Sequence, residues 1–181
     1  LTKQADTALY HAKQAGRGRY SYFTAVMSER ADRRLRLENE LRTAIASDQL
    51  FLVYQPKVAL PTRSIVGLEA LVRWRHPEGH VVPPLEFIPV AEETGLVHAI
   101  DDWVLRAACR QVRAWLDAGL PAVPVAVNLS LARFDAQTLI ENLRRALGEA
   151  GLGPEWIEVE FTESQMLGQD ERAAELIDGM R

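Results

Sequence analysis

The sequence has almost no cysteine and no long apolar run, and each absence excludes a class of protein. A single cysteine, Cys109, cannot form an internal disulfide, so a disulfide-stapled secreted scaffold is excluded and a reducing cytoplasm fits. Its neighbours Ala107, Ala108 and Val112 favour a small core residue over a nucleophile. No apolar run approaches the ~20 residues that cross a bilayer, and the N-terminus lacks the layout of a signal peptide. We therefore expect a cytoplasmic chain that makes no membrane contact itself, whether or not a longer parent protein is membrane-tethered upstream.

Positive charge is scarce where a nucleic-acid surface would need it. Residues 1–48 carry nine Lys and Arg against six acidic residues, whereas residues 49–181 carry twelve against nineteen. The acidic main body argues against binding a nucleic-acid polymer and is compatible with carboxylates that hold a cation. The length of 181 residues allows one medium domain, or one domain with part of a second.

Two apolar runs rich in β-branched residues predict a pair of strands joined by a turn. The runs are Phe51–Val58 and Ser64–Trp74, and a Pro-Thr-Arg-Ser segment lies near the turn between them. Glu69 lies inside the second run. A buried carboxylate there costs several kcal/mol unless it pairs, hydrogen-bonds or binds a metal. Taken alone, a glutamate on a solvated face of the strand is the simpler interpretation.

Helix and strand patterns then alternate along the chain. A 3.6-residue apolar period predicts a helix from Ile100 to Ala118, with Trp103 and Trp115 as core aromatics. The later predicted elements are strands at Pro124–Leu129 and Ile157–Phe161 and helices at Asp135–Ala150 and Glu171–Met180. This alternation is typical of parallel βα units, and a (β/α) barrel is the version consistent with polar residues at strand ends.

Three of the strands carry an oxygen-bearing side chain where the barrel mouth is expected. The carboxyl ends of barrel strands converge on one mouth, so Glu69, Asn128 and Glu160 are predicted to meet around one point. Oxygen ligands suit Mg²⁺ or Mn²⁺ and disfavour a zinc site. Such an ion beside a phosphodiester polarises the phosphoryl oxygen and lowers the pKa of bound water, and two ions ~3.5–4 Å apart hold the attacking and leaving oxygens in line. Phosphodiester hydrolysis is therefore a reaction that such a site can support.

The loop His76-Pro77-Glu78-Gly79-His80 offers a second metal interpretation. Proline and glycine between the two histidines break any helix that would place both imidazoles on one face. We therefore expect loop histidines and no metal pair.

The first 48 residues have a separate organisation. Residues 1–14 have a helix pattern and Tyr20–Phe23 a short strand pattern, and residues 25–48 form a charged helix with Glu38 and Arg42 as an i,i+4 pair. A helix that joins two domains can transmit rotation or support a homodimer, and a solvated tether has the same pattern. The sequence leaves these alternatives open.

Five short motifs occur in a fixed order between about Leu41 and Arg181. They are Tyr54-Gln55-Pro56, Gly67-Leu68-Glu69-Ala70-Leu71-Val72-Arg73-Trp74, Phe87-Ile88-Pro89-Val90-Ala91-Glu92, Asn128-Leu129-Ser130 and Glu160-Phe161-Thr162-Glu163-Ser164. Each motif is weak alone, but together they resemble the bacterial EAL-domain phosphodiesterases of cyclic di-GMP. The resemblance implies an α/β fold, a (β/α)8 TIM-like barrel of the EAL type, with only the first half present.

The resemblance also implies roles for individual residues. Glu69, Asn128 and Glu160 match metal ligands, with Glu69 in the catalytic centre and Mg²⁺ or Mn²⁺ as the cofactor. Gln55 and Arg73 match positions that contact the substrate, cyclic di-GMP. Glu163 matches a glutamate that holds a loop beside the metals without being a ligand.

The N-terminal segment Ala5-Asp6-Thr7-Ala8-Leu9-Tyr10 resembles the last helix of GGDEF domains, which are diguanylate cyclase domains and often precede EAL domains. The cyclase signature loop has no counterpart here, so the resemblance implies no cyclase activity. The expected organisation is a GGDEF-like tail at 1–24, a linker helix at 25–48 and an EAL phosphodiesterase domain, truncated, at 49–181.

The chain departs from the family pattern near its end. EAL domains continue with a strand that ends in two adjacent aspartates, then a water-activating lysine, a glutamate and a glutamine, and none of these has a counterpart before Arg181. The expected function is metal-dependent hydrolysis of cyclic di-GMP to linear pGpG in bacterial signalling, with this stretch inactive by itself. A non-catalytic cyclic di-GMP receptor and a regulatory or dimerisation module remain as alternatives.

Overall fold

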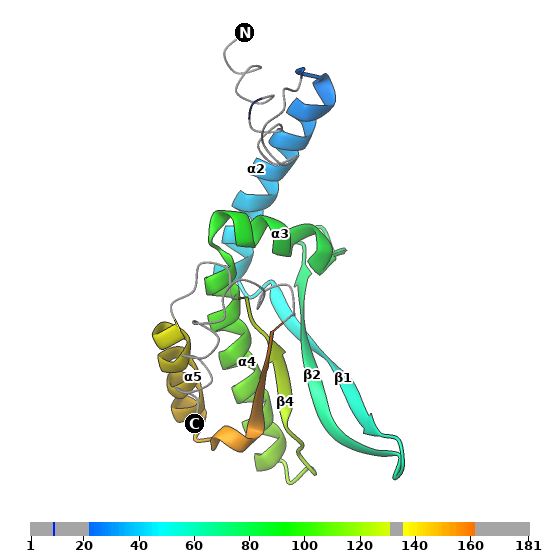
Figure 1. The fold of residues 1–181 in the computed structure, drawn as a ribbon, viewed down its shortest axis with the longest axis vertical. Helices are drawn as coiled ribbons and strands as arrows, with labels where there is room; N and C mark the ends of the chain where they lie inside the picture. The colour runs from blue at the N-terminus through cyan, green and yellow to red at the C-terminus, as the bar shows by residue number, and fades with distance from the viewer. Residues whose placement is uncertain (1–8, 10–21, 131–135, 162–181) are drawn as a thin grey trace. The chain divides into compact units, whose positions relative to one another are not determined.

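The computed structural model describes Leu9, residues 22–130 and residues 136–161 of the chain (Figure 1). The chain divides into two compact units, Leu1–Thr43 and Ala44–Arg181, and the candidate site lies in the second. In the first unit, the GGDEF-like tail expected at 1–24 lies almost wholly outside the described residues and stays a prediction. Its described residue Leu9 is 55% exposed.

Helix α2, Ala25–Ala46, corresponds to the predicted linker helix. The expected i,i+4 pair forms in it, with Arg42 Nη2 3.2 Å from Glu38 Oε1. Such an exposed pair contributes only a few tenths of a kcal/mol, so it favours the helix without fixing it. Tyr22 and Phe23, expected at the end of a short strand, have no regular secondary structure because they directly precede α2; residues 20 and 21 lie outside the described part.

The second unit begins with a long antiparallel hairpin. Strands β1, Leu50–Ala59, and β2, Ser64–Arg75, pair along their whole length, as the two predicted strands require. Arg63 takes a positive φ of 54° in the turn between them. The two-residue strand β3, Val81–Val82, pairs antiparallel with the end of β2 and is too short to leave a periodic signal in the sequence.

Parallel pairing starts where β2 meets β4, Val125–Asn128, and continues from β4 to β5, Ile157–Glu160. The strand order is β1-β2-β4-β5, and β3 pairs with the carboxyl end of β2. The three residues Val125, Ala126 and Val127 are buried, because β4 has a strand on each side and α4 packs against it. This confirms the covered central strand that the continuous apolar run indicates.

Three helices and one short 3-10 turn connect these strands. Helix α3, Pro84–Thr94, begins with proline in its first turn and ends at Gly95 with φ of 79°, a left-handed conformation that glycine adopts at little cost. Helix α4, Val97–Asp117, contacts β4, β1 and α5, Ala136–Ala150, and a turn at Pro154–Trp156 leads into β5 (Figure 1).

The core lies between α4 and the sheet. The buried stripe of α4 consists of Val97, Ile100, Asp101, Val104, Leu105, Ala108, Cys109 and Val112. Cys109 is a buried core residue, as predicted, and burial raises the pKa of its thiol to about 11. Trp103 and Trp115 are half-buried, so placing both in the core was wrong. They flank the buried stripe, and Trp115 covers the ring of Tyr54 edge to face at 5.0 Å.

Within residues 22–130 and 136–161, no helix is long and apolar enough to cross a membrane. The helix predicted at Glu171–Met180 lies outside the described residues.

The core of the second unit predicts a contrast between two residues of α3. Phe87 is fully buried and meets the Trp74 ring edge to face at 5.8 Å, whereas Leu85 is 90% exposed. We expect Phe87→Ala to lower the free energy of unfolding by about 3–5 kcal/mol, because it leaves a cavity. The control Leu85→Ala should change it by less than about 0.5 kcal/mol. Urea unfolding followed by tryptophan fluorescence measures both, and equal losses would contradict this placement of α3.

Candidate functional site

The register of the sheet places three of the predicted site residues on one face. Glu69 pairs with Ala126 in the parallel β2–β4 ladder, and Asn128 lies two residues further along β4. Glu160 of β5 is the register partner of Asn128. Since residues two apart in a strand and register partners share a face, Glu69, Asn128 and Glu160 project from the same side of the sheet. The side chains of Glu69 and Asn128 are in contact, because Asn128 Nδ2 donates a 2.6 Å hydrogen bond to Glu69 Oε1.

Glu69 lies inside its strand, as the second apolar run indicated, and not at a carboxyl end, as the predicted convergence at a barrel mouth required. Strand β2 continues to Arg75 beyond Glu69, because its second half pairs with β1 and β3 and not with β4. Asn128 and Glu160, in contrast, are the last residues of β4 and β5. The candidate site therefore combines a residue from the middle of the long strand β2 with residues from the carboxyl ends of the short strands β4 and β5.

The donor set of this face fits a hard divalent cation. Glu69 and Glu160 offer carboxylate oxygens and Asn128 an amide oxygen, with no thiol or imidazole among these three. Oxygen donors of this kind suit Mg²⁺ or Mn²⁺. The metal-ligand roles remain a prediction, and the chemistry and shared face of the three residues are compatible with it.

Lys57 is a member of this face that sequence reasoning missed. Its ammonium is ion-paired with Glu160 and lies 3.1 Å from Glu158 Oε2. The hydrogen bond to Glu160 is the main reason that the pKa of Lys57 is raised, and Glu158 adds to it while burial opposes it. The alternation of side chains along a strand could have identified Lys57, because it follows the predicted substrate contact Gln55 by two positions and so lies on the same face. The lysine supplies the positive charge beside Glu160 in this structure.

The predicted substrate contacts lie on the same face of the hairpin. Gln55 is the register partner of Glu69, and Arg73 is the partner of Phe51, two alternations further along β2. Arg73 Nη1 donates a 2.8 Å hydrogen bond to the Val72 carbonyl, which orients the guanidinium. Glu163, the predicted loop support, lies outside the described residues.

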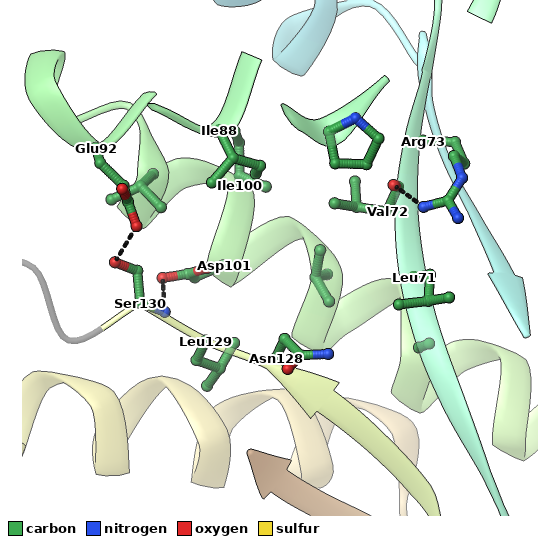
Figure 2. Close-up of a pocket in the computed structure, with 14 residues that line it drawn as sticks. Leu71, Val72, Arg73, Ile88, Glu92, Ile100, Asp101, Asn128, Leu129 and Ser130 are labelled. Atoms are coloured by element: carbon green, nitrogen blue, oxygen red, sulfur yellow. Dashed lines mark hydrogen bonds between the residues drawn. The ribbon is translucent and has the colours of Figure 1, made fainter. Parts of the chain in front are cut away.

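A cavity of about 460 Å³ opens beside this face (Figure 2). Its lining comes from β2, α3, α4 and the end of β4, and it includes Arg73 and Asn128 but not Gln55, Glu69 or Glu160. Most of the wall is apolar, contributed by Leu71, Val72, Pro84, Ile88, Val97, Ile100, Val104 and Leu129. A site with an apolar wall and few polar groups is typical of small-molecule pockets.

Two acidic residues of the helices hold the segment that follows β4. Asp101 Oδ2 of α4 accepts a 3.2 Å hydrogen bond from the Ser130 backbone N–H, and the Ser130 hydroxyl lies 3.3 Å from Glu92 Oε1 of α3 (Figure 2). Because Ser130 is two residues from Asn128, these contacts fix where Asn128 emerges from the sheet. Asp101 could have been identified from the sequence, because it occupies a position in the apolar period of α4 where an acidic residue is unusual.

Burial controls the ionisation of Asp101. The side chain is 5% exposed, and desolvation raises the pKa of its carboxyl to about 7. The Ser130 N–H opposes this rise, whereas the nearby Glu92 carboxylate adds to it. The pKa of Asp101 is therefore well above the ordinary value of 3.8.

The two loop histidines lie closer together than expected. The rings of His76 and His80 stack with centroids 4.6 Å apart and planes 24° apart, and Glu78 lies between them in sequence. The expectation that both are loop histidines is confirmed, because residues 76–80 form a turn and not a helix. The turn nevertheless brings the two rings together.

Comparison with known proteins places the chain in a family. A family profile described as the EAL domain matches residues 38–181. The bifunctional diguanylate cyclase/cyclic di-GMP phosphodiesterase MucR of Pseudomonas aeruginosa is 44% identical over 164 residues, which are 91% of this chain and 24% of that protein. The cyclic di-GMP phosphodiesterase PdeR of Escherichia coli is 41% identical over 177 residues, 98% of this chain and 26% of that protein. The chain thus spans about a quarter of the length of these curated relatives.

The solved structures agree with the fold described above. The PaMucR phosphodiesterase in complex with c-di-GMP is 40% identical and superimposes with a TM-score of 0.74, over 80% of this chain and 59% of that chain. This likeness confirms the expected fold class, a mixed α/β fold with parallel strands, of which the chain holds a part.

The raised pKa of Asp101 predicts a pH-dependent stability. The folded chain keeps the proton on this carboxyl up to about pH 7, whereas the unfolded chain releases it near pH 4. The contribution of Asp101 to the free energy of unfolding therefore falls as pH rises from about 4 to 7, by an amount on the order of 3 kcal/mol.

The variant Asp101→Asn removes this titration, so the stability difference between wild type and variant should shift in favour of the variant as pH rises through that range. The adjacent Asp102→Asn is the matched control, because Asp102 is ion-paired with Arg106 and Arg145 and is less buried. Urea unfolding at several pH values measures the difference. Parallel pH profiles for wild type and Asp101→Asn would contradict the raised pKa.

Proposed function

Because the chain belongs to the EAL domain family, we propose that it forms part of a metal-dependent phosphodiesterase that hydrolyses cyclic di-GMP to linear pGpG in bacterial signalling. The observation that carries the proposal is the contact between Glu69 and Asn128 on the face that also bears Glu160. Relatives named as cyclic di-GMP phosphodiesterases support the substrate.

In this proposal Glu69, Asn128 and Glu160 hold the cation. Mg²⁺ or Mn²⁺, when bound, supplies Lewis-acid polarisation of the phosphodiester. The hydrogen bond from Asn128 fixes the carboxylate of Glu69, and the register of β4 and β5 sets the spacing of Asn128 and Glu160. Lys57 holds Glu160 by an ion pair, so a cation at this face competes with the lysine for that carboxylate.

Substrate binding is assigned to Gln55 and Arg73. Arg73 lines the cavity, and a guanidinium with fixed geometry is well suited to a phosphate oxygen. Gln55 lies beside Glu69 in the hairpin and can donate its amide to a polar group of the substrate. Glu163 is proposed to hold a loop beside the metals without being a ligand.

The organisation of the longer protein is also a proposal. Residues 1–24 are the end of a GGDEF-like domain, and residues 25–48 are a helix that links it to the phosphodiesterase domain. The name of the relative MucR, which joins both activities, supports this arrangement. A homodimer formed through the linker helix is part of this proposal.

The activity test compares two lengths of the chain and one substitution. We expect the polypeptide extended through the rest of the domain to cleave cyclic di-GMP with Mg²⁺ or Mn²⁺ and to lose at least about 100-fold in rate on Glu69→Ala, because the cation loses a carboxylate ligand. The 181-residue chain by itself should show no appreciable cleavage. Chromatographic separation of pGpG from the substrate measures both.

The matched control is Glu155→Ala, an exposed glutamate on the turn before β5 that should leave the rate unchanged. Robust turnover by the 181-residue chain would mean that residues beyond Arg181 are dispensable. An extended chain that binds cyclic di-GMP without cleaving it would favour the receptor alternative, and a chain that neither binds nor cleaves it would refute the proposed substrate.

A further inference from the structure

The turn between β2 and β3 is rigid at its backbone. The His76 N–H donates a 2.9 Å hydrogen bond to the His80 carbonyl, and the Gly79 N–H donates a 2.8 Å bond to the His76 carbonyl. Gly79 has a φ of 92°, a conformation that side-chain-bearing residues rarely adopt. Pairing of β2 with β3 clamps both ends of the turn. The positions of the two histidine backbones are therefore set before any ligand arrives.

Three potential metal ligands converge on this turn. His76, Glu78 and His80 each offer one ligand atom, and these atoms all lie within 4.8 Å of one another. The carboxylate of Glu78 lies 3.8 Å from His76 Nδ1, which also accepts a 3.3 Å hydrogen bond from the Glu78 N–H. The two imidazole rings stack with their centroids 4.6 Å apart.

We propose that His76, Glu78 and His80 form a zinc site. Two imidazoles and one carboxylate are a ligand set that Zn²⁺ takes, with a fourth position left to water, whereas Mg²⁺ and Mn²⁺ prefer oxygen donors alone. Bonds of about 2.1 Å in a tetrahedron place ligand atoms roughly 3.4 Å apart. The distances between the three ligand atoms therefore have to contract by about an ångström on binding, through movement of the side chains.

The burial of the three side chains allows this contraction. Glu78 and His80 are exposed and can change rotamer freely, whereas the side chain of His76 is 16% exposed and lies 6.0 Å from the buried Trp74 ring. In this proposal the His76 side chain keeps its position, and the side chains of Glu78 and His80 move toward the ion.

The zinc site is separate from the oxygen-donor face described above. His76 follows Glu69 by seven residues along an extended chain, which is roughly 23 Å at about 3.3 Å per residue. His76 follows Arg73 by only three residues, so an ion bound at the turn holds the end of β2, the strand that carries the proposed substrate contact Arg73. The inference does not depend on the proposed phosphodiesterase activity.

The test is a zinc titration of the chain against a chromogenic chelator, with millimolar Mg²⁺ present to occupy oxygen-only sites. We expect one zinc ion per chain, and a loss of affinity of more than about 10-fold in His80→Ala and in His76→Ala. Glu78→Gln should weaken binding less, because an amide oxygen remains. The controls His98→Ala, on α4, and Glu86→Gln, on α3, should keep the wild-type affinity.

A second measurement locates the ion without any substitution. Two-dimensional NMR of the imidazole nitrogens should show zinc-dependent shifts for His76 and His80 and none for His98. Absence of zinc binding, unchanged affinity in His80→Ala, or zinc-dependent shifts at His98 in place of the turn histidines would each overturn the proposal.

Discussion

The parallel pairing of β4 with its two neighbours is the constraint on which the candidate site depends. It aligns Glu69 with Ala126 and Asn128 with Glu160, so polar side chains from three strands emerge on one face. A slip of one residue in either ladder would turn that strand's polar side chain toward the helices, where it would be buried without a partner. The buried run Val125–Val127 fixes the register, because its valines must face α4.

Helices α3 and α4 act on the site through the segment that follows β4. Asp101 and Glu92 both reach Ser130, one at its backbone N–H and the other at its hydroxyl. The cavity between these helices and β2 is lined by the same residues and by Arg73 (Figure 2). Both the pairing of β4 in the sheet and the contacts of Ser130 with Asp101 and Glu92 therefore help to determine the position of Asn128.

Two groups of donors with different chemistry lie near β2. The oxygen donors gather around the middle of β2, where parallel pairing begins, and the imidazoles gather at the turn beyond its end. Oxygen donors favour hard cations and imidazoles favour zinc, so the two groups need not compete for the same ion. Lys57 adds a third element, an ammonium that is ion-paired with Glu158 and Glu160.

Local signals in the sequence were enough to predict most of the strands and helices. Alternation and β-branched residues predicted β1, β2, β4 and β5, the 3.6-residue period predicted α4, and motif order predicted Glu69 and Asn128, because each signal is local in the chain. Which side chains meet depends on the tertiary structure. The ion pairs of Lys57 with Glu160, the contact of Asp101 with Ser130 and the stacking of His76 on His80 depend on register, helix docking and a turn conformation. Long-range pairing of this kind follows from packing of the whole unit, and a periodic pattern cannot encode it.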